Sequence, residues 1–162
     1  MAKKKTRKAT RATARPIARR SKATTPASRK TVKSGSLSIL SAGPGLTVND
    51  VEKSIAWYRD VLGFTVGERW ENDGTLLGAE MRAGKVSFML GQDDWKKGRD
   101  RVKGEGFRLY CVTDQDVDGV AAGIKSRGGT LAREPQDEWG VRSFAVEDPD
   151  GFKITISREL KR

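Results

Sequence analysis

The feature that most constrains the fold of this chain is an internal near-repeat between residues 46 and 156. One helix is predicted to start at Asp50 and to end at Gly63, and a second to start at Asp116 and to end at Gly128. Aspartate suits the N-cap of a helix, and glycine suits the left-handed residue that follows its end. With a shift of 66 residues, later positions also agree between the copies: Glu68 with Glu134, Gly74 with Gly140, Phe88 with Ile154, and Leu90 with Ile156.

Each copy reads as a strand, a helix and three further strands, which predicts an α+β fold of two βαβββ modules. The first and last strands of each copy alternate in polarity. One set of their residues is expected to pack under the helices: Leu46, Val48, Phe88, Leu90, Tyr110, Val112, Ile154 and Ile156. This choice aligns Leu46-Thr47-Val48 with Tyr110-Cys111-Val112 and leaves two extra residues in the second copy.

The alternate positions of these strands should point away from the helices. Their mixed polarity favours the wall of a concave pocket over a solvated outer face. Trp95 and Trp139 stand in otherwise polar segments, where aromatic side chains can add contact area. The predicted ligand-binding residues are therefore Thr47, Met89, Phe107, Leu109, Cys111, Thr155, Trp95 and Trp139. Between the copies, Asp93 is expected to cap a short helix that runs to about Arg101.

The N-terminal segment is strongly basic, and residues 1–36 are predicted to form a disordered tail before one domain at residues 37–160. Residues 1–34 hold 13 Lys and Arg and no Asp or Glu, which leaves 19 basic and 21 acidic residues elsewhere. This charge predicts salt-sensitive, sequence-independent contact with nucleic acid. The residues chosen for that contact include Lys3, Lys4, Lys5, Arg7, Lys8, Arg11, Arg19 and Arg20. The alternative is a solubilising extension without a partner.

The same N-terminus bears on the location of the protein. Its Arg, Ser and Thr content resembles an organelle transit peptide, but it lacks the apolar face of an amphipathic helix. The sequence has no apolar signal-peptide region and no run long enough to span a membrane. Cys111 is the only cysteine, so it forms no intramolecular disulfide and is compatible with a reducing compartment. We therefore expect a cytoplasmic location without a membrane partner.

The chain contains no histidine, which excludes a 2-His-1-carboxylate iron site, a zinc site with histidine ligands and a histidine general base. Histidine is the commonest metal ligand, and it is the usual general base near neutral pH. Cys111 has no histidine to activate its thiol, and no glycine-rich phosphate-binding motif occurs. Glu80 is expected to be a solvated strand residue, and the carboxylates of Asp148-Pro149-Asp150-Gly151 are expected to serve a turn. We therefore predict no catalytic residue and no cofactor, and we do not favour the hypothesis that the protein is an enzyme.

Three segments carry a resemblance to a known family: LTVNDVEKSIAWYRDVLGFTV, CVTDQDVDGVAAGIKSRGG and VEDPDGFKITIS. They resemble the two helix modules and the closing hairpin of the vicinal oxygen chelate superfamily. That superfamily includes glyoxalase I, extradiol dioxygenases and bleomycin-resistance proteins. The resemblance covers about 115 residues and implies the paired-module fold. It does not fix an activity, because one fold can carry many functions.

The resemblance also implies where a metal would bind. Metal-dependent members take their ligands from the first and last strands of each module, and the matching positions here are Gly43, Met89, Phe107 and Thr155. Thr155 stands where the closing motif usually has a glutamate. Glycine and phenylalanine offer no side-chain donor, and methionine and threonine are poor ligands for a hard divalent ion. We therefore predict that the family's metal site is absent.

These observations together favour a metal-free protein that binds a small organic molecule in a cleft between the modules. It would resemble the bleomycin-resistance branch of the family and form a homodimer. One alternative is a glyoxalase-type lyase or dioxygenase-type oxidoreductase with a non-standard metal site. The other is a nucleic-acid-associated protein that acts through its basic tail.

Overall fold

The chain folds into the two predicted βαβββ modules. The computed structural model describes residues 37, 39–99 and 101–161, so the predicted tail at residues 1–36 lies outside the described residues. Module 1 comprises β1 (Gly45–Val48), α1 (Val51–Asp60), β2 (Thr65–Asn72), β3 (Thr75–Ala83) and β4 (Val86–Gln92). Module 2 comprises β5 (Arg108–Val112), α2 (Val117–Ser126), β6 (Leu131–Glu138), β7 (Val141–Glu147) and β8 (Lys153–Glu159). This confirms the predicted α+β class.

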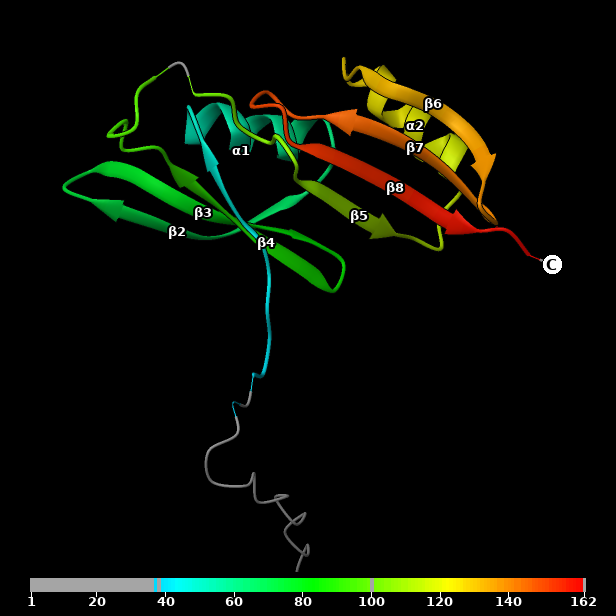
Figure 1. The fold of residues 1–162 in the computed structure, drawn as a ribbon, viewed down its shortest axis with the longest axis horizontal. Helices are drawn as coiled ribbons and strands as arrows, with labels where there is room; N and C mark the ends of the chain where they lie inside the picture. The colour runs from blue at the N-terminus through cyan, green and yellow to red at the C-terminus, as the bar shows by residue number, and fades with distance from the viewer. Residues whose placement is uncertain (1–36, 38, 100, 162) are drawn as a thin grey trace, which may run out of the picture. The chain divides into compact units, whose positions relative to one another are not determined.

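Each module has one four-stranded sheet, as Figure 1 shows. The strand orders are β1-β4-β3-β2 and β5-β8-β7-β6. The first strand of each module pairs in parallel with the last, and the remaining pairs are antiparallel. No helix among the described residues is long and apolar enough to cross a membrane.

The helix ends follow the local chemistry of the sequence. The Asp50 carboxylate accepts a hydrogen bond from the Lys53 amide at 3.0 Å, and Asp116 accepts one from the Gly119 amide at 2.9 Å. Gly63 and Gly128 adopt φ values of 81° and 84°, which side chains disfavour. The predicted N-caps and the predicted glycines after both helices are therefore confirmed.

The hydrophobic core lies between the helices and one face of each sheet. In module 1 it contains Tyr58, Phe64 and Phe88, whose rings meet edge to face with centroids 5.0–5.7 Å apart. Such aromatic pairs contribute about 0.5–1.5 kcal/mol each beyond area burial. In module 2, Phe144 and Ile154 are fully buried, and Ile154 occupies the position that matches Phe88.

The predicted orientation of β5 is wrong. Leu109 pairs with Ile154 and packs against the core, whereas Tyr110 and Val112 are 70% and 78% exposed. The sheet register matches Gly45 of β1 with Tyr110 of β5, an offset of 65 residues. The sequence alignment matches Leu46 with Tyr110, an offset of 64. A slip of one residue turns every side chain of a strand to the other face. Periodicity could not decide, because both alternating sets of this strand contain two apolar residues.

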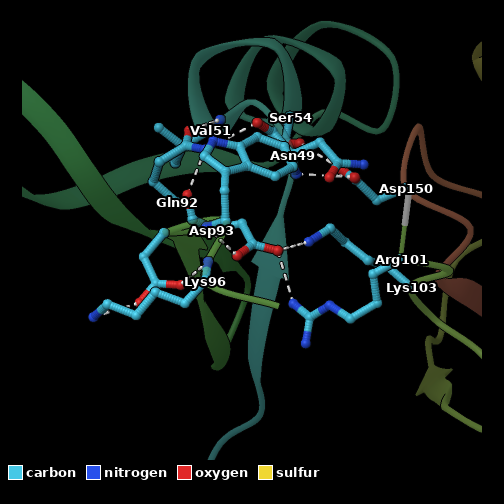
Figure 2. Close-up of polar contacts among 11 residues, drawn as sticks. Asn49, Val51, Ser54, Gln92, Asp93, Lys96, Arg101, Lys103 and Asp150 are labelled. Carbon is cyan, nitrogen blue, oxygen red and sulfur yellow. Dashed lines mark hydrogen bonds and ion pairs between the residues drawn. The ribbon is translucent and has the colours of Figure 1, made fainter. Parts of the chain in front are cut away.

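The turn between β7 and β8 joins module 2 to α1 of module 1. Asp150 accepts hydrogen bonds from the Asn49 amide at 2.9 Å and from the Ser54 hydroxyl at 3.3 Å (Figure 2). Asp148 accepts one from the Tyr58 hydroxyl at 2.8 Å, and its other oxygen accepts one from the Phe152 amide at 2.8 Å. Burial, and then the Asp148 carboxylate, raises the pKa of Tyr58 well above its ordinary value of 10.0. These carboxylates are structural, as the sequence predicted.

The segment between the modules is held by a buried ion pair. Asp93 pairs with the buried Lys103 and, at 2.7 Å, with Arg101 (Figure 2). Its other oxygen accepts a hydrogen bond from the Trp95 amide at 2.9 Å. The hydrogen bond from Lys103, followed by that from the Trp95 amide, holds the pKa of Asp93 well below its usual range. The helix predicted from Asp93 to Arg101 is not present among the described residues, because Asp93 anchors an irregular loop instead.

Candidate functional site

Two hollows lie on the sheet faces turned away from the helices, one on each module, and a third of about 700 Å³ lies where β5 and β8 end, beside Val112 and Leu160. The larger of the two sheet-face hollows, on module 2, has a volume of about 730 Å³, within the usual range for ligand pockets. Its lining includes Arg108, Tyr110, Trp139, Lys153, Thr155 and Ser157. Paired residues in the sheet form rows across this face, and one row runs from Tyr110 through Thr155 to Ala145. The row's small central side chains leave room beside the tyrosine.

Two exposed aromatic side chains stand over the module 2 hollow. Tyr110 is 70% exposed, and Trp139 is 93% exposed. Trp139 and Gly140 form the two-residue turn between β6 and β7, with φ values of 54° and 80°. Positive φ at both central residues indicates a type I′ turn, which favours Asn, Asp and Gly. A tryptophan at the first of these positions is both strained and solvated, so the fold itself does not require it.

The charges of the module 2 hollow are unevenly paired. Arg133 donates hydrogen bonds to Glu138 and to the Ser143 hydroxyl, both at 2.8 Å. Arg108 and Lys153 are directly paired in the β5–β8 ladder, and Glu147 is the partner of Lys153 on its other side in β7, so the three side chains lie on the same face. Two basic groups therefore stand beside one acidic group. This end of the hollow could receive an anionic group of a ligand.

The smaller hollow, on module 1, has a volume of about 310 Å³. Its side-chain walls are Thr47, Trp70, Leu77 and Met89, and its floor contains Gly45, Gly78 and Gly91. None of the described residues that line it is charged. The hollow could therefore hold an uncharged group.

The predicted ligand-binding residues are divided among four places. Thr155 and Trp139 line the module 2 hollow, whereas Thr47 and Met89 line the module 1 hollow. The remaining residues line neither of these two hollows: Phe107, Leu109, Cys111 and Trp95. The predicted single shared wall is therefore wrong, and ligand contact by any of these residues stays a prediction.

The misplaced residues have specific surroundings. Phe107 packs edge to face on Phe152 with centroids 5.8 Å apart, and it contacts the core together with Leu109 and Cys111. Burial raises the pKa of the Cys111 thiol, which makes it a poor nucleophile. Trp95 adopts a φ of 59°, and its ring lies 4.5 Å from the Arg99 guanidinium. Trp95 belongs to the loop between the modules.

Three residues on which the description of the hollows depends were not predicted from the sequence: Arg108, Tyr110 and Trp70. Lys153 was expected on this face, because it alternates with Ile154 along the strand. Arg108 and Tyr110 were missed because the orientation of β5 was reversed, and Tyr110 was assigned to the core. Trp70 stands among charged residues in β2, the same signal that singled out Trp95 and Trp139. Applied to strands as well as loops, that signal would have found Trp70.

The four positions implied by the family resemblance do not fit a metal ion. Gly43 has no side chain, Phe107 packs on the core, and Met89 and Thr155 lie on different sheets. In the described part of the chain, no group of three or more His, Cys, Asp or Glu residues is placed to hold a metal ion. Neither module therefore offers a donor set suited to a hard divalent cation.

Comparisons with known proteins agree with this architecture. Residues 39–156 match the Glyoxalase/Bleomycin resistance protein/Dioxygenase superfamily. A probable lactoylglutathione lyase from Synechocystis sp. is 30% identical over 118 residues, which are 68% of this chain and 88% of the relative. The glutathione transferase FosA of Serratia marcescens is 24% identical over 68% of this chain and 74% of the relative.

A solved structure shows the same fold. TnmS3, an antibiotic binding protein from Streptomyces sp. CB03234, superposes with a TM-score of 0.61 at 23% identity. The match covers 77% of this chain and all of TnmS3. At this identity the likeness concerns the fold, because related folds can carry different functions.

Proposed function

This chain belongs to the glyoxalase/bleomycin resistance protein/dioxygenase superfamily, and we propose that it binds a small organic molecule on its sheet faces without a metal ion. The observation that carries the proposal is the module 2 hollow, where Tyr110 and Trp139 stand exposed over a floor of small side chains. Exposed aromatic residues around a concave surface are typical of ligand and interface sites. Arg108 and Lys153 at one end would hold an acidic group of the ligand.

Binding is favoured over catalysis by the side chains at the family's metal positions. They provide no donor set for a hard cation, and Cys111 is partly buried with a raised pKa. The antibiotic binding protein TnmS3 shares the fold, which makes antibiotics a reasonable first class of compound to test. The lactoylglutathione lyase relative supports the alternative, an enzyme whose metal is held by other residues.

Elemental analysis and a thermal-shift screen of the full chain test this proposal. We expect no stoichiometric Zn, Ni, Fe or Mn and no change of Tm with chelator, because a tightly bound metal stabilises the native state. At least one compound from an antibiotic and organic-acid library should raise the Tm. Tyr110→Ala should reduce that shift, whereas Val86→Ala, at an exposed residue outside the hollow, should not. One metal ion per chain with a chelator-induced fall in Tm would refute the metal-free proposal.

We also propose that the protein forms a homodimer in the cytoplasm. β1 and β5 are edge strands of their sheets, and β5 ends at Val112, an exposed apolar residue outside the ligand hollow. Exposed edges and apolar side chains of this kind favour association with a second copy. Light scattering on the purified protein should give twice the chain mass of 17.8 kDa, and a monomer at micromolar concentration would contradict the dimer.

A second candidate function, nucleic-acid association, is supported by the N-terminal charge alone. Thirteen basic residues without an acidic one should release counterions from a phosphate backbone. Full-length protein should bind DNA or RNA at low salt and lose binding steeply as salt rises. A chain lacking residues 1–36 should not bind. Equal binding by both forms would show that these residues are not the contact.

A further inference from the structure

Module 1 carries glycine where module 2 carries side chains on the same sheet face. One row of paired residues in module 1 runs Thr47, Gly91, Gly78 and Trp70, and the matching row in module 2 runs Val112, Ser157, Ser143 and Gln136. In the adjoining row, Gly45 pairs with Met89, and its counterpart Tyr110 pairs with Thr155. Three side chains of module 2 are therefore missing from this face of module 1.

Two of these glycines leave open space above the sheet. A Cβ atom built on Gly45 or on Gly91 would have no heavy atom within 4 Å outside its chain neighbours. Neither residue has positive φ, so the backbone does not require glycine at either position. Glycine weakens a strand by roughly 0.5–1 kcal/mol relative to alanine and often marks a place where a ligand approaches closely.

The third glycine positions a wall of the hollow. A Cβ on Gly78 would lie 3.0 Å from Cε3 of Trp70 and 2.6 Å from the Leu90 carbonyl oxygen. Gly78 therefore lets the indole of Trp70 lie close over β3. Beside it, Gly45 and Gly91 expose bare backbone, and Met89 and Leu77 stand 46% and 47% exposed around it. The result is a shallow slot with an aromatic wall and a flat floor.

The charge of the slot limits what it can hold. None of its described lining residues is charged, and the nearby Glu80 is paired with Arg82 at 2.5 Å. A charged ligand group would lose its water there without gaining a partner, which is costly. An uncharged ring loses little water and gains contact with the indole and the sheet.

We propose that module 1 carries a second ligand subsite, a slot that takes the flat face of an uncharged fused-ring group. This inference rests on the proposed small-molecule function and specifies part of the ligand's chemistry. The module 2 hollow takes the polar or acidic part of a ligand, and the module 1 slot takes an uncharged planar part. Trp70 forms the wall, while Gly45 and Gly91 keep the floor open.

The test compares two uncharged probes and fills the slot with the protein's own counterpart residues. Acridone is a flat three-ring compound, and benzophenone has two rings twisted out of a common plane. The full chain should bind acridone at least tenfold more tightly than benzophenone. Gly45→Tyr should weaken acridone binding at least tenfold, and Gly91→Ser by a smaller factor. Lys85→Tyr places the same ring at an exposed turn outside the slot and should leave binding unchanged.

Each outcome decides the proposal. Acridone binding that survives both glycine substitutions, equal binding of benzophenone, or no acridone binding overturns the slot. Unchanged Tm in the variants separates a blocked slot from a misfolded chain, and Gly91→Ser serves if Gly45→Tyr does not fold. Binding of the library compound whose affinity Tyr110→Ala reduces is measured in parallel on the unmutated chain. If that compound binds and acridone does not, the slot proposal fails and the proposed function stands. If no library compound binds, the proposed function itself fails.

Discussion

The two modules are nearly alike on their helix side and differ on their open sheet face. Both helices start at an aspartate cap and are followed by a left-handed glycine, and both sheets bury an apolar face under the helix. On the open face, module 1 has three glycines and Trp70, whereas module 2 has Tyr110, Ser143, Ser157 and several charged residues.

This difference separates the residues that maintain the fold from those free to set a ligand preference. Each module needs its helix caps and a filled core, because losing a cap or opening a cavity in the core lowers the free energy of unfolding by about 1–5 kcal/mol. The open faces carry no such constraint, and their residues differ at almost every matched position. The contrast predicts that substitutions on the helix side change stability and that substitutions on the faces change binding.

The chain's two tyrosines, one per module, give the largest test of this contrast. Tyr58→Phe removes a hydroxyl that donates to the buried Asp148 carboxylate. We expect the free energy of unfolding to fall by about 2 kcal/mol, because a buried acceptor loses a donor. Tyr110→Phe removes an exposed hydroxyl and should change the free energy of unfolding by less than about 0.5 kcal/mol. Equal losses of this free energy in urea unfolding would mean that the helix side and the open face contribute equally to stability.

Alkaline pH should produce a second, smaller difference in stability between the variants of Tyr58 and Tyr110. Burial, with Asp148 second, raises the pKa of Tyr58 well above 10.0. Above pH 10, the unfolded chain therefore releases a proton that the folded chain keeps, so folding loses stability as pH rises. The wild type and Tyr110→Phe should each lose roughly 1 kcal/mol per pH unit from this group, and Tyr58→Phe should not. If the stability gap between Tyr58→Phe and wild type stays constant from pH 9 to 11, Tyr58 does not titrate as inferred.

The parts of the fold that were predictable from sequence depend on contacts close along the chain. Asp50 and Asp116 cap helices through amides three residues away, and Gly74 and Gly140 mark hairpin turns that local chemistry specifies. The orientation of β5 depends instead on its pairing with β8, more than 40 residues later. Because Tyr110 and Leu109 are both apolar, the strand's own pattern could not choose between them.

The hollows depend on the same long-range pairing. Gly45, Gly78 and Gly91 come from three different strands, and only the sheet register brings them together. Alternation with Leu46 and Val48 places Gly45 on the open face, but no local signal in the sequence distinguishes Gly78 and Gly91 from glycines that serve turns. Trp139 could be selected because it stands alone in a polar segment, but its strained turn position became evident only from its φ of 54°.

The smallest expected effect on stability, and the most direct contrast between the modules, concerns the matched hairpin turns. Asp73 and Gly74 form the turn in module 1, and Trp139 and Gly140 form it in module 2, with positive φ at all four residues. Trp139→Asn should raise the free energy of unfolding by about 0.5 kcal/mol, because asparagine tolerates this conformation better. Asp73→Trp should lower it by a similar amount.

Binding should respond in the opposite direction to stability at this turn. Trp139 is 93% exposed over the module 2 hollow, so Trp139→Asn should weaken a library ligand about tenfold while the chain becomes more stable. Asp73→Trp lies outside the residues lining either hollow and should leave that affinity unchanged. Urea unfolding and ligand titration of both variants make the comparison. A Trp139→Asn variant that gains stability and keeps full affinity would show that the strained tryptophan does not contact the ligand.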